Sequence, residues 1–378
     1  MPCLPYKVSL PDCCAADILA RRVHLALLLF LGLAPLAGCS STGETAAPRL
    51  SPATFGDEQS AYTITGYGNL LSLLEPPARK TTLADFLYGP EEEEVRWFRT
   101  PQGMAISGTN LYVCDQSRPA VVQIDLVTGR RHSQIRRQDR PACPVDVTVG
   151  SDRVYVADSS RGLVLEYDEG LRYLSAFTPK GSPSFKPAAV LVADGLLYAA
   201  DLAERCVHIW DLRTRTWQAQ LRPPGDRATM GAPSGLAVTR DGTLLIADAL
   251  MGVIHRYAKD GQWLAPIGNR GREPGQLVRP IGVWQVAGDI ILVADAAKQV
   301  INAYDGTGVF LYEIDRPAAN GRWTLPCDVV SGPSLPPALS RIQESNSDHS
   351  IGWFLVSDTL GEFGVSLFIV TAGGQSAS

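Results

Sequence analysis

The strongest constraint on the fold is a strand–turn–strand unit that occurs six times along the sequence. Each unit begins at a proline, continues through a short apolar run and a turn, and ends in a second apolar run that closes on aspartate. The closing residues are Asp115, Asp158, Asp201, Asp248, Asp295 and Asp358. The first five lie 43 or 47 residues apart, and the sixth follows 63 residues later because an insertion interrupts its unit. Short apolar runs between turn residues indicate strands, and this period is typical of propeller blades.

Most units continue with a third run that ends in an aromatic residue and Asp, as in residues 208–211 (HIWD), and then a fourth run. The last unit lacks its fourth run, whereas residues 63–74 contain a strand pattern that has no partner of its own. Pairing the two leaves no open sheet edge in the ring. We therefore predict an all-β fold, a six-bladed β-propeller over residues 62–370, in which an N-terminal strand closes the last blade.

The repeated strings resemble a known family. Residues 233–238 (PSGLAV) show a Pro-x-Gly-apolar-Ala-Val start, residues 154–158 (VYVAD) show the second run, and residues 268–277 (GNRGREPGQL) show the glycine-rich approach to a unit. This combination is similar to the NHL repeat of six-bladed, TolB-like propellers, over about residues 95–370. Asp146 and Ala189 replace the glycine in two units, and the sixth unit departs most. The resemblance implies a fold, but this fold carries many unrelated activities.

Residues 1–38 predict a lipoprotein signal peptide. Arg21 and Arg22 precede an apolar run over 23–33, which is too short for a typical transmembrane helix. Residues 36–39 (LAGC) then resemble the bacterial lipobox. That resemblance implies cleavage before Cys39 and acylation of its thiol with chains such as palmitate. The alternative is an ordinary secretory signal with an incidental cysteine.

By the same resemblance, Ser40 after the cysteine implies sorting to the outer membrane of the bacterial cell envelope. Residues 39–61 are rich in Ser, Thr, Ala and Pro, which predicts a flexible tether, and residues 371–378 predict a disordered tail. The chain is 19% charged with a net charge of −5, so nucleic acid is not an expected partner. We expect a membrane partner through the anchor and a protein partner in the envelope.

The closing aspartates admit two interpretations, a ring of metal ligands or local acceptors of backbone N–H groups. An aspartate at the start of a tight turn commonly accepts such bonds, and we predict that role. Histidine provides a second test, because NHL-type amidating lyases bring several histidines to a zinc ion. After Cys39 the chain has four histidines, and we expect two of them, His208 and His255, at equivalent exposed positions on third strands. No cofactor is therefore predicted.

Lactonase-like propellers instead use acidic and amide residues at the channel mouth. Asp146 and Asp328 occupy first-strand positions that could point into the channel, which makes them the one alternative metal pair, although they lack Asn or Glu partners. We therefore predict no metal and no catalytic residue. The favoured function is a non-catalytic binding or scaffolding module, and the alternative is a metal-dependent propeller hydrolase or lyase with its site at the central channel.

Two further sets of residues have predicted roles. Cys114 ends a second strand and Cys143 begins the next blade, so these two suit a disulfide in an oxidising compartment; the alternative is two buried free thiols. Four basic residues follow a closing aspartate by three or four positions and should lie on one face: Arg118, Arg161, Arg205 and Lys298. They are either a docking face for an acidic partner or solvated turn residues.

Overall fold

The computed structural model describes the propeller part of the chain. The described residues are 53–55, 62–70, 74, 98–133, 140–225, 229–318, 321–332, 335, 350–361 and 364–372. Contacts divide the chain into two units, Met1–Pro48 and Arg49–Ser378, and all described residues belong to the second. The predicted signal peptide and Cys39 lie outside them, as does most of the insertion at 331–349.

Six antiparallel sheets form the second unit, and we number them as blades 1 to 6. Blade 1 contains β3 (Pro101–Ser107), β4 (Asn110–Asp115), β5 (Ala120–Asp125) and β6 (Arg131–Ser133). Blade 2 contains β7 (Pro144–Gly150), β8 (Arg153–Asp158), β9 (Leu163–Asp168) and β10 (Tyr173–Phe177). Blade 3 contains β11 (Pro187–Ala193), β12 (Leu196–Asp201), β13 (Cys206–Asp211) and β14 (Thr216–Leu221).

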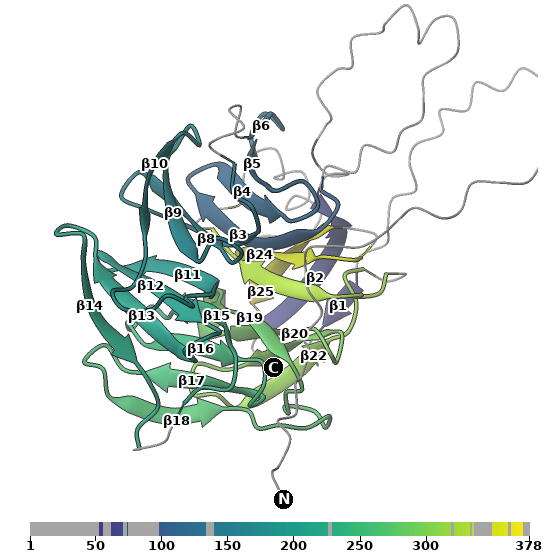
Figure 1. Cartoon of the computed structure of the whole chain (residues 1–378). Coiled ribbons are helices and arrows are strands. Elements are labelled where there is room, and N and C mark those ends of the chain that lie inside the picture. Colours follow the sequence, from purple (N-terminus) through teal and green to yellow (C-terminus); the bar gives the residue numbers. More distant parts are fainter. Residues whose placement is uncertain are drawn as a thin grey trace, which may run out of the picture. The chain divides into compact units, whose positions relative to one another are not determined.

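The remaining blades follow the same order. Blade 4 contains β15 (Pro233–Val238), β16 (Leu244–Asp248), β17 (Val253–Tyr257) and β18 (Trp263–Ile267). Blade 5 contains β19 (Pro280–Gln285), the short 3-10 helix η2 (Ala287–Asp289), β20 (Ile291–Asp295), β21 (Val300–Tyr304) and β22 (Phe310–Ile314). Figure 1 shows the sheets arranged around a centre, with fourth strands such as β14 and β18 on the outside.

Blade 6 is the closing blade. It contains β23 (Pro326–Val330), β24 (Ser350–Asp358), β25 (Val365–Ala372), β2 (Tyr62–Asn69) and β1 (Ala53–Phe55). The strand order is β1-β2-β25-β24-β23, so both ends of the unit pair in one sheet (purple and yellow in Figure 1). First strands of neighbouring blades contact one another in turn from β3 through β7, β11, β15, β19 and β23 back to β3. The predicted six-bladed propeller and its N-terminal closing strand are thus confirmed.

The boundaries of the closing blade differ from the sequence prediction in two ways. A fifth strand, β1, lies inside the segment that we expected to be a tether, and it pairs Phe55 with Ile64 of β2. At the other end, β25 continues to Ala372, beyond the predicted limit at residue 370. The edge of this blade is therefore β1 and not the closing strand itself.

The hydrophobic core lies between the blades. Second strands such as Leu244–Asp248 are buried along their whole length, whereas the outer strand Thr216–Leu221 is mostly exposed. A strand covered on both faces needs a continuous apolar run and not an alternating one, which is what these segments contain. In blade 6, Phe354 and Phe368 stack with ring centroids 4.8 Å apart and share a core cluster with Ile64 of the closing strand.

The first strands approach each other too closely for most side chains at one position, two residues after the starting proline. A Cβ at Gly235 would lie 2.2 Å from the carbonyl oxygen of Ile281 in the next blade. Ala189 and the two aspartates Asp146 and Asp328 occupy this position in blades 3, 2 and 6.

The described residues contain no helix long and apolar enough to cross a membrane.

Candidate functional site

The closing aspartates are acceptors for backbone N–H groups, as predicted. In blade 5, the carboxylate of Asp295 accepts bonds from Ala297 and Lys298 in the following turn, at 3.1 and 3.0 Å. It also accepts bonds from Val278 and Arg279, in the segment that enters the first strand, at 2.6 and 3.1 Å. The sequence did not predict this second pair of bonds. Each carboxylate therefore ties its turn to the start of its own blade.

The upstream bonds follow a fixed pattern in five of the six blades. There, Oδ2 of the aspartate accepts one upstream N–H and Oδ1 accepts the next; the donors to Oδ2 are Arg99, Ala142, Gly231, Val278 and Thr324. In blade 3, Lys186 donates to Oδ1 of Asp201 as expected, at 3.1 Å. The preceding N–H, that of Phe185, donates instead to the carbonyl oxygen of Ser182. Oδ2 of Asp201 therefore lacks the upstream amide bond that the other five aspartates have.

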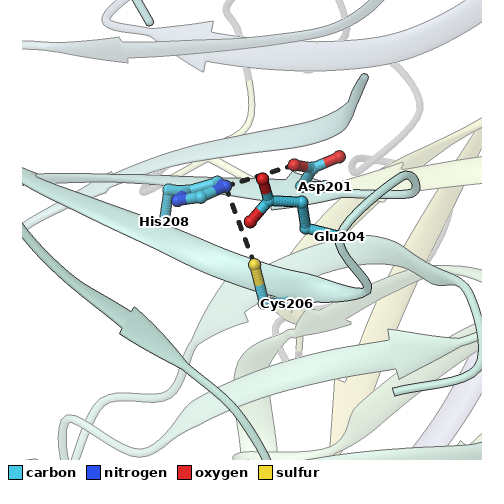
Figure 2. Close-up of side chains that lie close together, drawn as sticks. All are labelled: Asp201, Glu204, Cys206 and His208. Carbon is cyan, nitrogen blue, oxygen red and sulfur yellow. Dashed lines mark hydrogen bonds and ion pairs between the residues drawn. The ribbon is translucent and has the colours of Figure 1, made fainter. Parts of the chain in front are cut away.

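Four side chains with metal-binding atoms lie close together around Asp201 in blade 3 (Figure 2). Asp201 ends β12, Glu204 lies in the turn, and Cys206 and His208 lie on β13. Their ligand atoms all lie within 4.8 Å of one another. Nε2 of His208 is 3.2 Å from Oδ2 of Asp201 and 3.6 Å from Sγ of Cys206. Asp201, Cys206 and His208 are fully buried, and Glu204 is partly exposed.

The surroundings of this cluster suppress thiol reactivity. Burial, as the largest cause, together with Asp201 and Glu204, raises the pKa of Cys206 to about 12, although Arg222 opposes the rise. A thiol nucleophile needs a lowered pKa. A catalytic triad would also need the carboxylate at the other ring nitrogen of the histidine, whereas both Asp201 and Cys206 face Nε2. The arrangement suits a metal ion better than nucleophilic catalysis.

Burial of the two third-strand histidines contradicts the sequence prediction of exposed histidines. His208 is 0% exposed and His255 is 7% exposed. In blade 4, Nε2 of His255 lies 3.1 Å from Oδ2 of Asp248, so both histidines pair with a closing aspartate seven residues earlier. The same position in blade 5 holds Asn302, a shorter side chain that is fully buried with no partner for its amide among the described residues. Pairing with an aspartate and cover from the neighbouring strands explain why the histidines point inward.

The two carboxylates predicted as the alternative channel site lie on first strands on either side of blade 1. Asp146 accepts N–H bonds from Val147 and from Val190 in the next blade, both at 2.8 Å. Asp328 accepts N–H bonds from Val329 at 2.8 Å and from Met104 in blade 1 at 2.7 Å. Each carboxylate therefore connects the first strands of two adjacent blades.

Both of these carboxyl groups keep a proton to higher pH than an ordinary aspartate. Burial raises the pKa of Asp328 to about 7 against the opposing backbone bonds. Burial, with repulsion from Asp328 as the second cause, raises the pKa of Asp146 well above its ordinary value. Near pH 7 a substantial fraction of Asp328 therefore carries a proton, and Asp146 keeps its proton to higher pH than an ordinary aspartate.

For the cysteines and for the basic residues, two alternatives each were left open by the sequence. Cys114 and Cys143 are both buried, and the structure has no disulfide between them. Lys298 does not reach an open face, since its side chain is 7% exposed and its ammonium group pairs with Glu313. The guanidinium Nε of Arg205 donates to the carbonyl oxygen of Met230 at 2.6 Å. The guanidinium Nε of Arg161 lies 3.5 Å from Oδ2 of Asp158. Arg118 is exposed, but the four residues do not form one free basic surface.

Comparison with known proteins places the chain by fold alone. No protein-family model and no curated protein matches its sequence. A gluconolactonase from Xanthomonas campestris is 13% identical, with 85% of this chain and 95% of that chain covered and a TM-score of 0.54. A protein of unknown function from Bacteroides thetaiotaomicron is 15% identical over 72% and 70% of the two chains, with a TM-score of 0.55. A catalytically inactive virginiamycin B lyase from Staphylococcus aureus is 13% identical over 72% and 94%, with a TM-score of 0.50. Identities this low establish a shared propeller fold and no activity.

Proposed function

We propose that this protein is a lipid-anchored, NHL-type propeller of the bacterial cell envelope that acts as a non-catalytic binding module for a protein partner. The observation that carries the binding role is a set of exposed apolar side chains at one end of the propeller. Leu250 and Met251 are 53% and 50% exposed, and Leu360 is 64% exposed. All three lie in turns that follow a closing aspartate, in blades 4 and 6. Exposed apolar side chains mark a protein-interaction surface where they form one contiguous patch, so the proposed role requires that these turns present one together.

The chemistry of the channel supports binding over the alternative, a metal-dependent hydrolase or lyase with its site in the channel. A divalent ion is held by ionised carboxylates, so metal binding must remove their protons. Because burial raises the pKa of both Asp146 and Asp328, an ion there would have to displace protons near neutral pH. The remaining four equivalent positions are Gly or Ala and offer no side-chain ligand.

Site-specific photo-crosslinking in cells tests the proposed binding end. A photoreactive residue at Leu250 should give a discrete adduct with one envelope protein, because this side chain is exposed at the proposed contact. Val309 is the matched control, since it is 61% exposed but lies in the turn between the third and fourth strands of blade 5, at the opposite end. Adducts of equal yield at both positions, or none at Leu250, Met251 and Leu360, would contradict the proposal.

The lipid anchor leads to a separate prediction. Cys39→Ala removes the thiol that would carry the acyl chains, and two or more chains are needed for stable membrane anchoring. We expect the variant to leave the membrane fraction or to stay unprocessed, as measured by fractionation and by the mass of the mature chain. Cys114→Ala is a suitable control, because this cysteine is buried inside the propeller and lies outside the candidate metal cluster. A processed Cys39→Ala protein that remained in the membrane would overturn the anchor.

A further inference from the structure

We propose that Asp201, Glu204, Cys206 and His208 form a binding site for one transition-metal ion, with zinc as the best match. Zinc is commonly bound by thiolate, imidazole and carboxylate ligands in a tetrahedron, at about 2.3 Å from sulfur and about 2.0–2.1 Å from nitrogen or oxygen. Those bond lengths give tetrahedron edges of about 3.6 Å from sulfur to nitrogen and about 3.3 Å from nitrogen to oxygen. The structure has 3.6 Å from Cys206 Sγ to His208 Nε2 and 3.2 Å from that nitrogen to Asp201 Oδ2. Two of the six donor–donor distances therefore already match the edges of such a site, and all four ligand atoms lie within 4.8 Å of one another.

The altered hydrogen bonding of Asp201 is a second observation that points to a ligand. In the other five blades an upstream N–H occupies Oδ2 of the closing aspartate, as Gly231 does for Asp248 at 2.6 Å. In blade 3 the corresponding N–H, that of Phe185, donates to Ser182. A carboxylate oxygen relieved of an amide donor has a lone pair available for a metal ion. This difference occurs in the blade that also supplies the thiol and the second carboxylate.

Blade 4 provides an internal comparison. It has the same aspartate–histidine pair, Asp248 and His255, but Met251 and Val253 take the places of Glu204 and Cys206. The pair alone is thus a structural feature of this repeat. The thiol and the glutamate of blade 3 are additional, and nothing in the repeat requires two more metal-binding groups beside a buried histidine.

The charges around the cluster suit a divalent ion. The two carboxylates and the thiolate would bring three negative charges, the ion two positive charges, and Arg222 a third positive charge, so the group becomes neutral overall. Arg222 donates to the carbonyl oxygen of Glu204 at 2.9 Å and lies 3.9 Å from its carboxylate. Gln220 also donates to the Glu204 carboxylate, at 2.9 Å. Such outer contacts fix the direction of a metal ligand.

The contact with Trp217 determines which ring nitrogen of His208 carries the proton before a metal ion binds. Its indole N–H lies 3.3 Å from Nδ1 of His208, and an indole can only donate. In the metal-free protein the ring proton therefore lies on Nε2, between the imidazole and Asp201. When a metal takes Nε2, this proton moves to Nδ1 and breaks the bond from Trp217, while the Cys206 thiol releases one proton to solvent. Trp217 is 37% exposed and can turn outward, so its fluorescence should report binding.

Four protein ligands would leave no open coordination position, which is the property of a structural zinc site and not of a catalytic one. The ion would join the end of β12, the turn and the start of β13. Since Glu204 is the partly exposed ligand, it marks the side from which the ion enters.

Cobalt titration of the chelator-treated full chain tests the proposal, because Co²⁺ reports thiolate ligation by charge-transfer absorption and tetrahedral geometry by strong visible bands. We expect one Co²⁺ per chain, displaced by Zn²⁺, together with a change in Trp217 fluorescence that is absent in Trp217→Phe. Cys206→Ser should lose the charge-transfer band and weaken Zn²⁺ binding by at least ~100-fold, since loss of an outer contact alone typically costs 10–100-fold. Glu204→Gln, at a partly exposed position, should weaken binding by at least ~10-fold with an unchanged metal-free melting temperature.

Two control variants keep the outcome interpretable. His255→Asn in blade 4 and the double variant Asp146→Asn/Asp328→Asn on the first strands of blades 2 and 6 should leave both the absorption and the affinity unchanged. Absence of the charge-transfer band in the wild-type chain would overturn the proposal, as would a band that persists in Cys206→Ser. If Cys206→Ser does not fold, an affinity unchanged in Glu204→Gln has the same meaning. None of these results depends on the lipid anchor or on the protein partner.

Discussion

A chain that begins at Pro76 should fail to form a stable propeller, whereas one that begins at Arg49 should fold. The shorter chain lacks β2, which pairs with β25 along most of its length, and also lacks the buried side chains Ile64, Leu70 and Leu74. Burial of each such side chain contributes about 1.5–3 kcal/mol, and the unpaired edge of β25 would promote aggregation. We expect a loss of more than ~5 kcal/mol in the free energy of unfolding, seen as insoluble protein or a collapsed melting transition.

A chain that begins at Ala61 separates the roles of the two N-terminal strands. It keeps the closing strand β2 but loses β1, the edge strand of three residues. Its melting temperature should fall slightly, by far less than that of the chain from Pro76. Equal stability of the chains from Ala61 and Pro76 would show that β2 does not close the ring.

The free energy of unfolding should fall as the pH rises from about 5 to about 8, and most of this slope should come from Asp146 and Asp328. Burial raises the pKa of Asp328 to about 7 and that of Asp146 well above its usual range. In this pH window the folded protein holds protons that the unfolded chain has already released. Stability therefore decreases with pH wherever the folded state binds more protons. The effect should be on the order of 2–4 kcal/mol, because one unit of pKa corresponds to ~1.4 kcal/mol.

Asp146→Asn/Asp328→Asn, which imitates the neutral acids, should flatten this slope in urea denaturation measured at several pH values. Asp211→Asn is the control, because the N–H of Thr214 lowers the pKa of Asp211. That carboxylate is already ionised in both states above pH 5, so its replacement should not change the slope. Wild-type and double-variant slopes that coincide would mean that the pair is ionised at neutral pH.

The fold could be predicted because each blade has its own short sequence pattern and this pattern occurs six times. Each unit repeats a proline, two apolar runs and a closing aspartate, and the missing fourth strand of the last unit identifies the closing strand. β1 escaped prediction because residues 53–55 are too few to show any periodicity. Its place depends on the exposed edge that β2 offers.

The candidate metal site was only partly readable from the sequence. Cys206 and His208 are two residues apart on a strand, so alternation puts them on one face. Asp201, at the end of the preceding strand, and Glu204, in the turn between the two strands, come just before them. This spacing could have identified the cluster. The displaced N–H of Phe185 could not be predicted, because it depends on the path of the loop that enters β11. Likewise, Lys298 meets Glu313 on another strand, and nothing near it in the sequence indicates that partner.

The position of the closing strand also sets the time at which the fold can be completed. The hydroxyl of Thr371 in β25 donates a hydrogen bond to the carbonyl oxygen of Thr63 in β2, although the two residues lie 308 positions apart in the sequence. At the usual rate of synthesis of about 5–20 residues per second, roughly 15–60 s pass between the appearance of β2 and that of its partner. During this interval the edge of β2 that later pairs with β25 stays open, while β1 is available to pair with the other edge, and five complete blades can form without β2. The ring therefore closes only after the last residues of β25 have been made, and until then the edge of β2 that β25 covers is open to pairing with other chains.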